Sequence, residues 1–300
     1  LPPNNPQFGI DVKGGVIRLA TTGRKRANPE AKQDSPEFWN TTTTNQVYTV
    51  EQRGKVLTVL GKSENLGHEG ESVQSARFVG NRGYVVTFRQ TDPLVVLDLK
   101  NPAAPTVLGE IEIPGFSQYM HPLDENHLIT FGVSGNWGVQ LQLFDVTDPA
   151  KSIPQPKVLD FGEGSSSEAQ YNHKALTYFA EQNLLGLPLY SYGNGYTANF
   201  SSTLQLVKVD AATGFTKVGA VDHAGLYEEQ QPSCVQCYDG FCEYVCYYNY
   251  QPEVRRGHFV TSDDATYVYS FSYAGVIVND LANLDEDLAV IPFPEPTYDS

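Results

Sequence analysis

The sequence predicts an all-β protein made of repeated four-stranded sheets, and three observations lead to this prediction. First, one pattern repeats with a period of roughly 45 residues. In each repeat, two or three β-rich runs end at an acidic turn, and a further apolar run follows. Second, the composition favours strands and turns, with 18 Tyr, 26 Gly and a single Met. Third, residues 139–144 and 204–209 alternate as half-buried strands do. Such units are typical of the blades of a β-propeller.

Taken in order, the repeats predict about five blades in one propeller domain over residues 1–300. Their spans are 9–61, 75–113, 119–161, 171–221 and 254–291. The repeat pattern is clearest in the second and third blades, where a turn rich in Asp and Pro ends the third strand. Five blades could close a small ring, or they could form part of a larger one.

Three long insertions interrupt the repeats, at residues 23–44, 193–202 and 223–251. Insertions of this length in a compact fold are usually functional or disordered. The third is rich in cysteine and tyrosine. One interpretation is a loop that needs cross-links because it has no core of its own. The other is a stiff aromatic lid that binds a partner, since Tyr-rich loops are common binding surfaces.

All four cysteines lie in the third insertion: Cys234, Cys237, Cys242 and Cys246. The second pair has one residue too many for a paired Cys-x-x-Cys zinc site, and the gap between the pairs is short. A β-hairpin turning at residues 239–240 would place Cys237 opposite Cys242, and a bulge would bring Cys234 to Cys246. We therefore favour two nested disulfides over zinc, and hence an oxidising compartment.

The charge balance limits the partners that this chain can have. The formal net charge is −15, with only 20 Lys and Arg. Phosphate backbones and anionic membrane surfaces need clustered cations, so neither nucleic acid nor such a membrane is an expected partner. No stretch has the apolar length of a membrane span. The Pro-rich start at residues 1–6 lacks the pattern of a signal peptide, and we expect a processed mature chain.

Three segments carry a resemblance to a known family: residues 75–94, 121–129 and 167–175. They are similar to secreted prokaryotic β-propeller proteins that are distantly related to WD repeats. The resemblance implies a secreted or surface-tethered propeller and implies no activity. Members of that family are usually longer, with more β-rich sequence upstream. The resemblance therefore also implies an upstream propeller fragment as a possible partner.

Aligning the opening strands of the repeats gives a candidate site. Arg77, His121, His173 and Arg256 fall at nearly equivalent positions, and Glu168 lies close by in the sequence. First strands line the central channel of a propeller, so these side chains are expected to converge there and to bind an anion or a carboxylated ligand. The structural alternative is that Glu71, Glu168 and backbone carbonyls satisfy these side chains internally and so join neighbouring blades, because interior cations need countercharge.

The sequence leaves two kinds of metal site as alternatives. His121, His173 and Glu168 are suitable ligands for zinc or iron, although nothing in the sequence fixes their spacing. The acidic turns at 124–126, 145–148 and 285–287 offer oxygen ligands for a structural calcium ion, but none matches an EF-hand loop.

Two classes of function follow. The favoured one is a secreted, non-catalytic scaffold that binds a protein, a glycan or a small anion, because the sequence shows no Gly-x-Ser-x-Gly elbow and no phosphate-binding Gly-rich loop. The alternative is a hydrolase or metalloenzyme that uses the channel His, Glu and Arg side chains.

Overall fold

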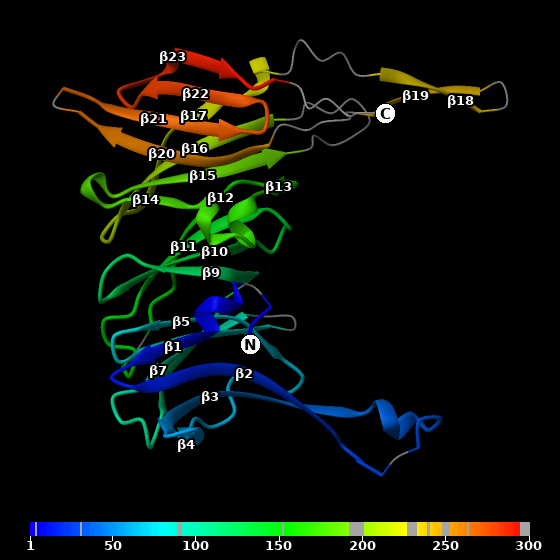
Figure 1. Cartoon of the computed structure of the whole chain (residues 1–300), viewed down its shortest axis with the longest axis vertical. Helices are drawn as coiled ribbons and strands as arrows, with labels where there is room; N and C mark the ends of the chain where they lie inside the picture. The colour runs from blue at the N-terminus through cyan, green and yellow to red at the C-terminus, as the bar shows by residue number, and fades with distance from the viewer. Residues whose placement is uncertain are drawn as a thin grey trace. The chain divides into compact units, whose positions relative to one another are not determined.

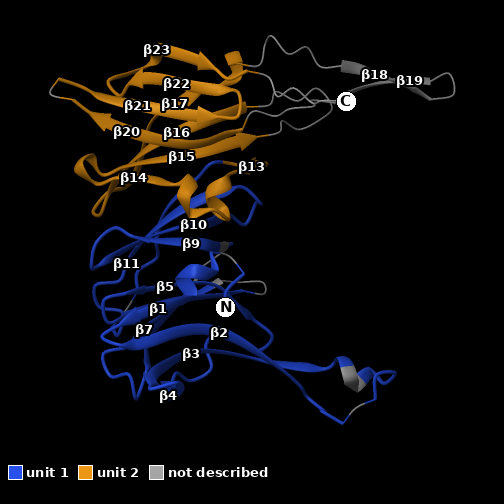
Figure 2. Cartoon of the chain, in the orientation of Figure 1, with its two compact units in different colours: residues 1–161 blue, residues 162–300 orange. Residues whose placement is uncertain are grey.

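The computed structural model of the 300-residue chain consists of two compact units, residues 1–161 and 162–300 (Figure 2). It describes residues 1–3, 5–30, 32–88, 92–113, 115–151, 153–191, 201–226, 233–238, 241–247, 253–262 and 264–294. Strands and short 3₁₀ turns make up both units (Figure 1). In the described part of the chain, no helix has the length and apolar character needed to cross a bilayer.

The first unit contains three sheets, each formed by four antiparallel strands that follow one another along the chain. We call these sheets blades 1 to 3. Blade 1 consists of β1 (Ile10–Lys13), β2 (Val16–Arg26), β3 (Thr41–Arg53) and β4 (Val56–Lys62). Blade 2 consists of β5 (Ser72–Val79), β6 (Arg82–Phe88), β7 (Asp92–Asp98) and β8 (Thr106–Ile113). Blade 3 consists of β9 (Phe116–Pro122), β10 (His127–Val133), β11 (Val139–Asp145) and β12 (Lys157–Asp160).

The second unit contains two further blades with the same meander. Blade 4 consists of β13 (Ser165–Ser166), β14 (Thr177–Phe179), β15 (Leu184–Ser191), β16 (Ser201–Asp210) and β17 (Gly214–Asp222). Blade 5 consists of β20 (Val254–Thr261), β21 (Thr266–Ser272), β22 (Gly275–Asp280) and β23 (Asn283–Pro292). In blade 4 the first strand is split into β13 and β14, which both pair with β15. The prediction of an all-β propeller of four-stranded blades is confirmed.

An aspartate ends the third strand in four of the blades and holds the turn that follows. Asp98, Asp145, Asp210 and Asp280 each accept a hydrogen bond from the backbone N–H two residues further on, at 2.8 to 3.0 Å. A short side-chain acceptor satisfies a turn donor that the sheet leaves unpaired. The acidic corners that recur in the sequence therefore have a local structural cause.

Buried aliphatic and aromatic side chains hold neighbouring blades together within each unit. In the first unit, one cluster joins blade 1 to blade 2 through Ala20 and Val47, and a second joins blade 2 to blade 3 around Phe144. In the second unit, Leu204 and Phe259 belong to the cluster that joins blades 4 and 5. Blade 2 thus has both faces covered, which explains the nearly continuous burial of β6.

The first strands of three blades share a β-bulge. The pairing register gains one extra residue at Gln74 in β5, at Gln118 in β9 and at Arg255 in β20. A bulge bends the strand and re-aims the side chains around it. Because the same irregularity recurs, it gives a reliable reference point for comparing positions between blades.

The cysteine segment forms the predicted hairpin, from β18 (Ser233–Tyr238) and β19 (Phe241–Tyr247). Its backbone register pairs Cys237 with Cys242 and Cys234 with Cys246, with a bulge in between, so the predicted register is confirmed. The expected turn at 239–240 lies outside the described residues.

Candidate functional site

In the first unit, Arg77 lies on β5 against the aromatic ring of Phe8. The central carbon of the guanidinium is 4.1 Å from the ring centroid. Phe8 belongs to the 3₁₀ turn η1 (Pro6–Gly9), and its ring lies 5.5 Å from that of Tyr119 on β9. A cation held over an aromatic face is attracted by the ring quadrupole, which fixes Arg77 without neutralising it.

His121 completes this group from β9. Its Nδ1 lies 3.4 Å from the hydroxyl of Tyr119. Burial, together with the smaller effect of the nearby charge of Arg77, lowers the pKa of His121 to about 4. Burial also raises the pKa of Tyr119, although Arg77 opposes that shift. The Arg77 cluster (Phe8, Arg77, Tyr119 and His121) therefore presents one fixed positive charge beside two neutral hydrogen-bonding groups at pH 7.

Arg77 has no carboxylate partner within the described residues. Its Nη1 is buried and makes no hydrogen bond in that part of the chain. Glu71, one of the two glutamates expected to pair with these cations, instead accepts hydrogen bonds from the hydroxyl of Thr87 at 2.6 Å and from the backbone of His68 at 2.8 Å. Its Oε1 also lies 3.2 Å from Nδ1 of His68. A buried guanidinium nitrogen without an acceptor is unusual, because interior polar atoms are nearly always paired.

In the second unit, Glu168 is the centre of a contrasting group. Its side chain is 5% exposed and lies 2.6 Å from Nε of Arg255 on β20. The two groups form an ion pair, although the contact at Oε2 of Glu168 does not have the geometry of an ordinary hydrogen bond. Asn172 donates to Oε1 at 2.5 Å, and Arg255 also lies 4.8 Å from the ring centroid of Tyr273. We call these four residues the Glu168 cluster.

Two capped 3₁₀ turns position this cluster by splitting the first strand of blade 4. Ser167 caps η3 (Glu168–Gln170), where its hydroxyl accepts from the backbone of Ala169 at 3.2 Å. Asn172 caps η4 (His173–Ala175) by accepting from the backbone of Lys174 at 3.2 Å. Asn172 thus links the two turns, because its amide nitrogen bonds Glu168 while its oxygen holds η4. His173 is half-buried at the start of η4.

The bulges change which residues are equivalent between blades. Arg77, His121 and His258 each lie three residues after a bulge residue, so His258 occupies the position that the sequence alignment gave to Arg256. Arg256 itself is exposed, and the neighbouring Arg255 makes the contact with Glu168. Sequence reasoning missed Arg255 and His258 because a one-residue bulge leaves no mark in a strand pattern.

The five predicted site residues thus fall into two groups. Arg77 and His121 come together in the first unit. Glu168, His173 and Arg256 belong to the second unit, where Glu168 and His173 lie on adjoining turns. The convergence of all five on one channel stays a prediction.

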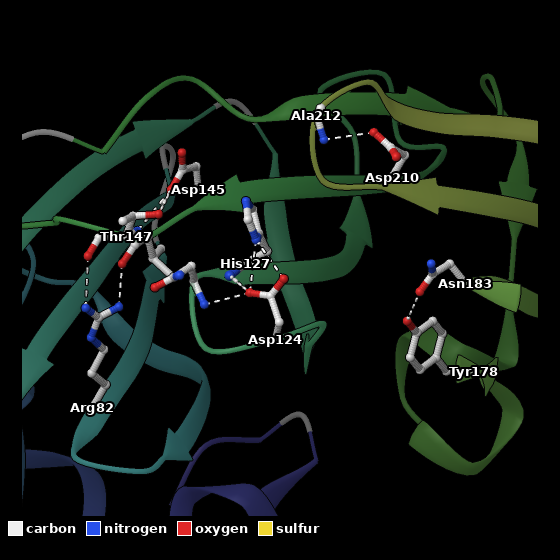
Figure 3. A network of polar contacts seen from close by, with 11 residues as sticks. Arg82, Asp124, His127, Asp145, Thr147, Tyr178, Asn183, Asp210 and Ala212 are labelled. Carbon is white, nitrogen blue, oxygen red and sulfur yellow. Dashed lines mark hydrogen bonds and ion pairs between the residues drawn. The ribbon is translucent and has the colours of Figure 1, made fainter. Parts of the chain in front are cut away.

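A second polar network lies at the turns of blades 2 and 3 (Figure 3). Arg82 donates to the backbone oxygens of Val146 and Thr147, the latter at 3.1 Å, and so joins the two blades. Asp145 accepts from Thr147, while both carboxylate oxygens of Asp124 lie 2.9 Å from Nδ1 of His127 (Figure 3).

These carboxylates, two of those considered as calcium ligands, thus act as turn acceptors. Hydrogen bonds from Thr147 are the main cause that lowers the pKa of Asp145. Among the described residues, no group of three or more His, Cys, Asp or Glu side chains could hold a metal ion.

A cavity of about 210 Å³ in the first unit collects three cationic side chains, those of Lys13, Arg18 and Lys100. Arg18 is paired with Asp11 and donates to the backbone oxygen of Gly80 at 2.8 Å. The cationic groups available to a ligand in this cavity are therefore mainly the two lysines. The cavity is a second place in the first unit where an anion could bind, and it serves as a control for the Arg77 cluster.

Two archaeal relatives share much of this sequence. A protein of Archaeoglobus fulgidus, described as uncharacterized, is 35% identical over 203 residues, which cover 67% of this chain and 28% of the relative. One from Methanocaldococcus jannaschii, also described as uncharacterized, is 32% identical over 206 residues, or 68% of this chain and 30% of the relative. The matched segment thus spans less than a third of either relative.

The solved structures that match this chain are much more distant in sequence. A europium-containing methanol dehydrogenase is 10% identical with a TM-score of 0.48, over 95% of this chain and 50% of that chain. The WD40 domain of Toxoplasma gondii coronin is 12% identical with a TM-score of 0.36, over 88% and 65%. A putative 6-phosphogluconolactonase from Bacteroides fragilis is 11% identical with a TM-score of 0.36, over 89% and 77%.

The family comparison agrees with the blade architecture. The model of the Beta propeller domain matches residues 4–284, which include every strand from β1 to β22 and the first two residues of β23. Consecutive four-stranded meanders and this match over most of the chain show that the protein belongs to the Beta propeller domain family.

Proposed function

We propose that this protein is a binding scaffold that recognises a carboxylate-bearing ligand at the Arg77 cluster. One observation carries the proposal: Nη1 of Arg77 is buried without a hydrogen-bond partner in the described part of the chain. An anionic ligand would supply a countercharge that Arg77 lacks among the described residues, and charge-assisted hydrogen bonds to guanidinium are among the stronger ones available.

The neighbours of Arg77 suit a carboxylate. Neutral His121 and the hydroxyl of Tyr119 can each donate to or accept from the ligand without adding charge. Phe8 covers one face of the guanidinium, so the planar edge would make the hydrogen bonds to the ligand. Blades on either side provide a rigid frame, and rigid frames with polar inner residues commonly serve for binding.

The catalytic alternative has less support from this geometry. A histidine with a pKa of about 4 is a weak general base at neutral pH, and this one lies beside a cation that disfavours its protonation. Binding is therefore the function that the geometry of the Arg77 cluster supports better.

The hairpin adds a proposal about location. The register of β18 and β19 supports nested disulfides Cys234–Cys246 and Cys237–Cys242, and hence a secreted or surface-associated protein. Mass mapping without reductant tests this pairing. Four free thiols, or crossed pairs, in protein prepared under oxidising conditions would contradict it.

Calorimetric titration with galacturonate and citrate tests the binding site, with uncharged galactose as the control ligand. Arg77→Met should weaken binding of the acids about tenfold or more, because a hydrogen bond to a charged group contributes about 1.5–3 kcal/mol. Arg77→Lys should recover part of the affinity. Binding of the acids that is lost in a Lys13→Gln/Lys100→Gln variant and kept in Arg77→Met would place the site in the cavity instead and refute the proposal.

A further inference from the structure

The cavity in the first unit lies where the ends of β1, β5 and β7, and the turns after them, meet. These segments contribute Lys13, Asn81 and Lys100 to its lining, and Arg18 and Thr49 come from β2 and β3. Its volume of about 210 Å³ is less than the roughly 300 Å³ at which pockets for drug-sized ligands begin. A small ion, or the end group of a larger ligand, is therefore what the cavity can enclose.

Hydrogen bonds between the two blades hold the walls of this cavity in place. The backbone N–H of Leu99 donates to the backbone oxygen of Asn81 at 2.8 Å, which joins the turn after β7 to the turn after β5. The hydroxyl of Thr49 in blade 1 donates to the backbone oxygen of Pro102 in blade 2. A ligand would thus meet a frame that is already ordered, which lowers the entropy cost of binding.

Two lysines bring positive charge to the cavity from different blades. Nζ of Lys13 donates to the amide oxygen of Asn81 at 2.7 Å, a neutral partner that leaves the charge of the ammonium group in place. Asp98 lies close to Lys100 in the chain, but its carboxylate accepts from the backbone N–H of Lys100 at 2.8 Å. Within the described residues, neither ammonium group forms an ion pair with a carboxylate. An anion in the cavity would offset both charges.

The third cation, Arg18, limits which anion fits. Its Nε and Nη2 contact the carboxylate of Asp11, and its Nη1 donates to the backbone oxygen of Gly80 at 2.8 Å. The planar fork that recognises a carboxylate is therefore already in use. The remaining donors are two ammonium groups, which are compact charges with three rotatable N–H donors each. Two such groups on different sides suit a tetrahedral ion with two negative charges.

We propose that this cavity binds a phosphate group, either as the free ion or as the end group of a small phosphate ester. Such a group carries about −1.5 to −2 charges at pH 7. A shallow hollow of about 620 Å³ adjoins the cavity and shares Lys100 and Pro102 with it, so it would hold the rest of an ester. The inference is independent of the Arg77 cluster and of the carboxylates proposed to bind there.

The net charge of −15 does not exclude an anionic ligand at this place. At physiological ionic strength, charges separated by more than about 8 Å in solvent are largely screened from one another. The local groups therefore decide, and Lys13 and Lys100 are the cations of the lining that no described carboxylate pairs with.

Calorimetric titration with inorganic phosphate and with glycerol phosphate tests the site, with glycerol as the uncharged control. Lys13→Gln/Lys100→Gln should weaken binding of both phosphates about tenfold or more, because it removes both charge-assisted donors. Lys55→Gln/Lys208→Gln is the matched variant: it removes the same charge outside the cavity and should change the affinity less than about twofold. All four lysines are exposed, so both variants should fold.

Arg77→Met should leave the affinity for both phosphates unchanged, which separates this site from the Arg77 cluster. Tighter binding of glycerol phosphate than of inorganic phosphate would identify an ester as the ligand, and the reverse order would identify the free ion. A dissociation constant above about 10 mM for both phosphates in the parent protein would overturn the proposal. An equal loss of affinity in the two lysine variants would overturn it as well, since it would show an effect of net charge alone.

Discussion

Two arginines on first strands of the propeller blades have opposite surroundings. Arg255, in the second unit, forms an ion pair with the buried carboxylate of Glu168. Arg77, in the first unit, stacks on Phe8 and keeps a buried nitrogen without an acceptor in the described part of the chain. The same residue type thus serves cohesion in one unit and, as we propose, recognition in the other. Charge pairing, rather than position on a strand, separates the two roles.

The largest expected effect concerns the two histidines that must stay neutral, one in each unit. The pKa values of His121 and His223 are both lowered to about 4, mainly by burial. The unfolded chain takes up these protons below about pH 6.5, whereas the folded chain does so only near pH 4. Stability is therefore full above pH 6.5 and falls as the pH is lowered toward 4, by up to about 3 kcal/mol for each histidine.

Urea unfolding at about pH 7 and about pH 5 measures this loss. His223→Gln should remove the share of His223, which is fully buried beside Ser270. Lowered carboxylate pKa values, such as that of Asp145, act below this window and do not mimic the effect. A free energy of unfolding that is unchanged between the two pH values would contradict the assignment.

The next effect breaks the ion pair itself. Glu168→Gln keeps an acceptor for Asn172 but removes the buried carboxylate that lies 2.6 Å from Arg255, and leaves only that of Glu253 at 3.6 Å in the described part of the chain. The variant should lower the free energy of unfolding by about 2 kcal/mol. Arg77→Met is the matched variant, and it should change stability by less than about 1 kcal/mol because no partner is orphaned. If Arg77→Met proved as damaging as Glu168→Gln, the contrast between the two arginines would be lost.

The smallest effect sharpens the comparison at a single group. Arg77→Met should raise the pKa of His121, because the charge of Arg77 is one of the two causes that lower it. The pKa of His223 should not move, since burial lowers it and only Asp287 acts on it electrostatically. NMR titration of the two imidazoles in the parent and variant proteins measures both. A pKa of His121 that stays constant would show that burial alone sets it.

The fold was predictable because the same local sequence features recur from blade to blade. Alternating apolar residues specify half-buried strands, and the aspartate that ends a third strand holds a turn in the structure, as at Asp98 and Asp145. The hairpin register at Cys237 and Cys242 was predictable for the same reason, since a two-residue turn fixes strand pairing.

The site was predictable only in part. Arg77 and His121 were correctly predicted to be equivalent because each lies three residues after a bulge. The extra residue therefore shifts both positions equally. Arg255 was missed because the bulge residue itself cannot be recognised from side-chain alternation. The 3₁₀ turns that carry Glu168 were also not visible, since short capped turns interrupt a strand without a hydrophobic period.

The bulge in β20 makes the pairing of Glu168 sensitive to a change of one residue in the length of the chain. Arg255 and Arg256 are adjacent and chemically identical, yet only the first neutralises Glu168 while the second meets solvent. Loss or gain of one codon ahead of them would exchange these roles without altering the amino-acid composition of the strand by more than one residue. Homologous chains can therefore differ in internal charge balance through a change in length alone.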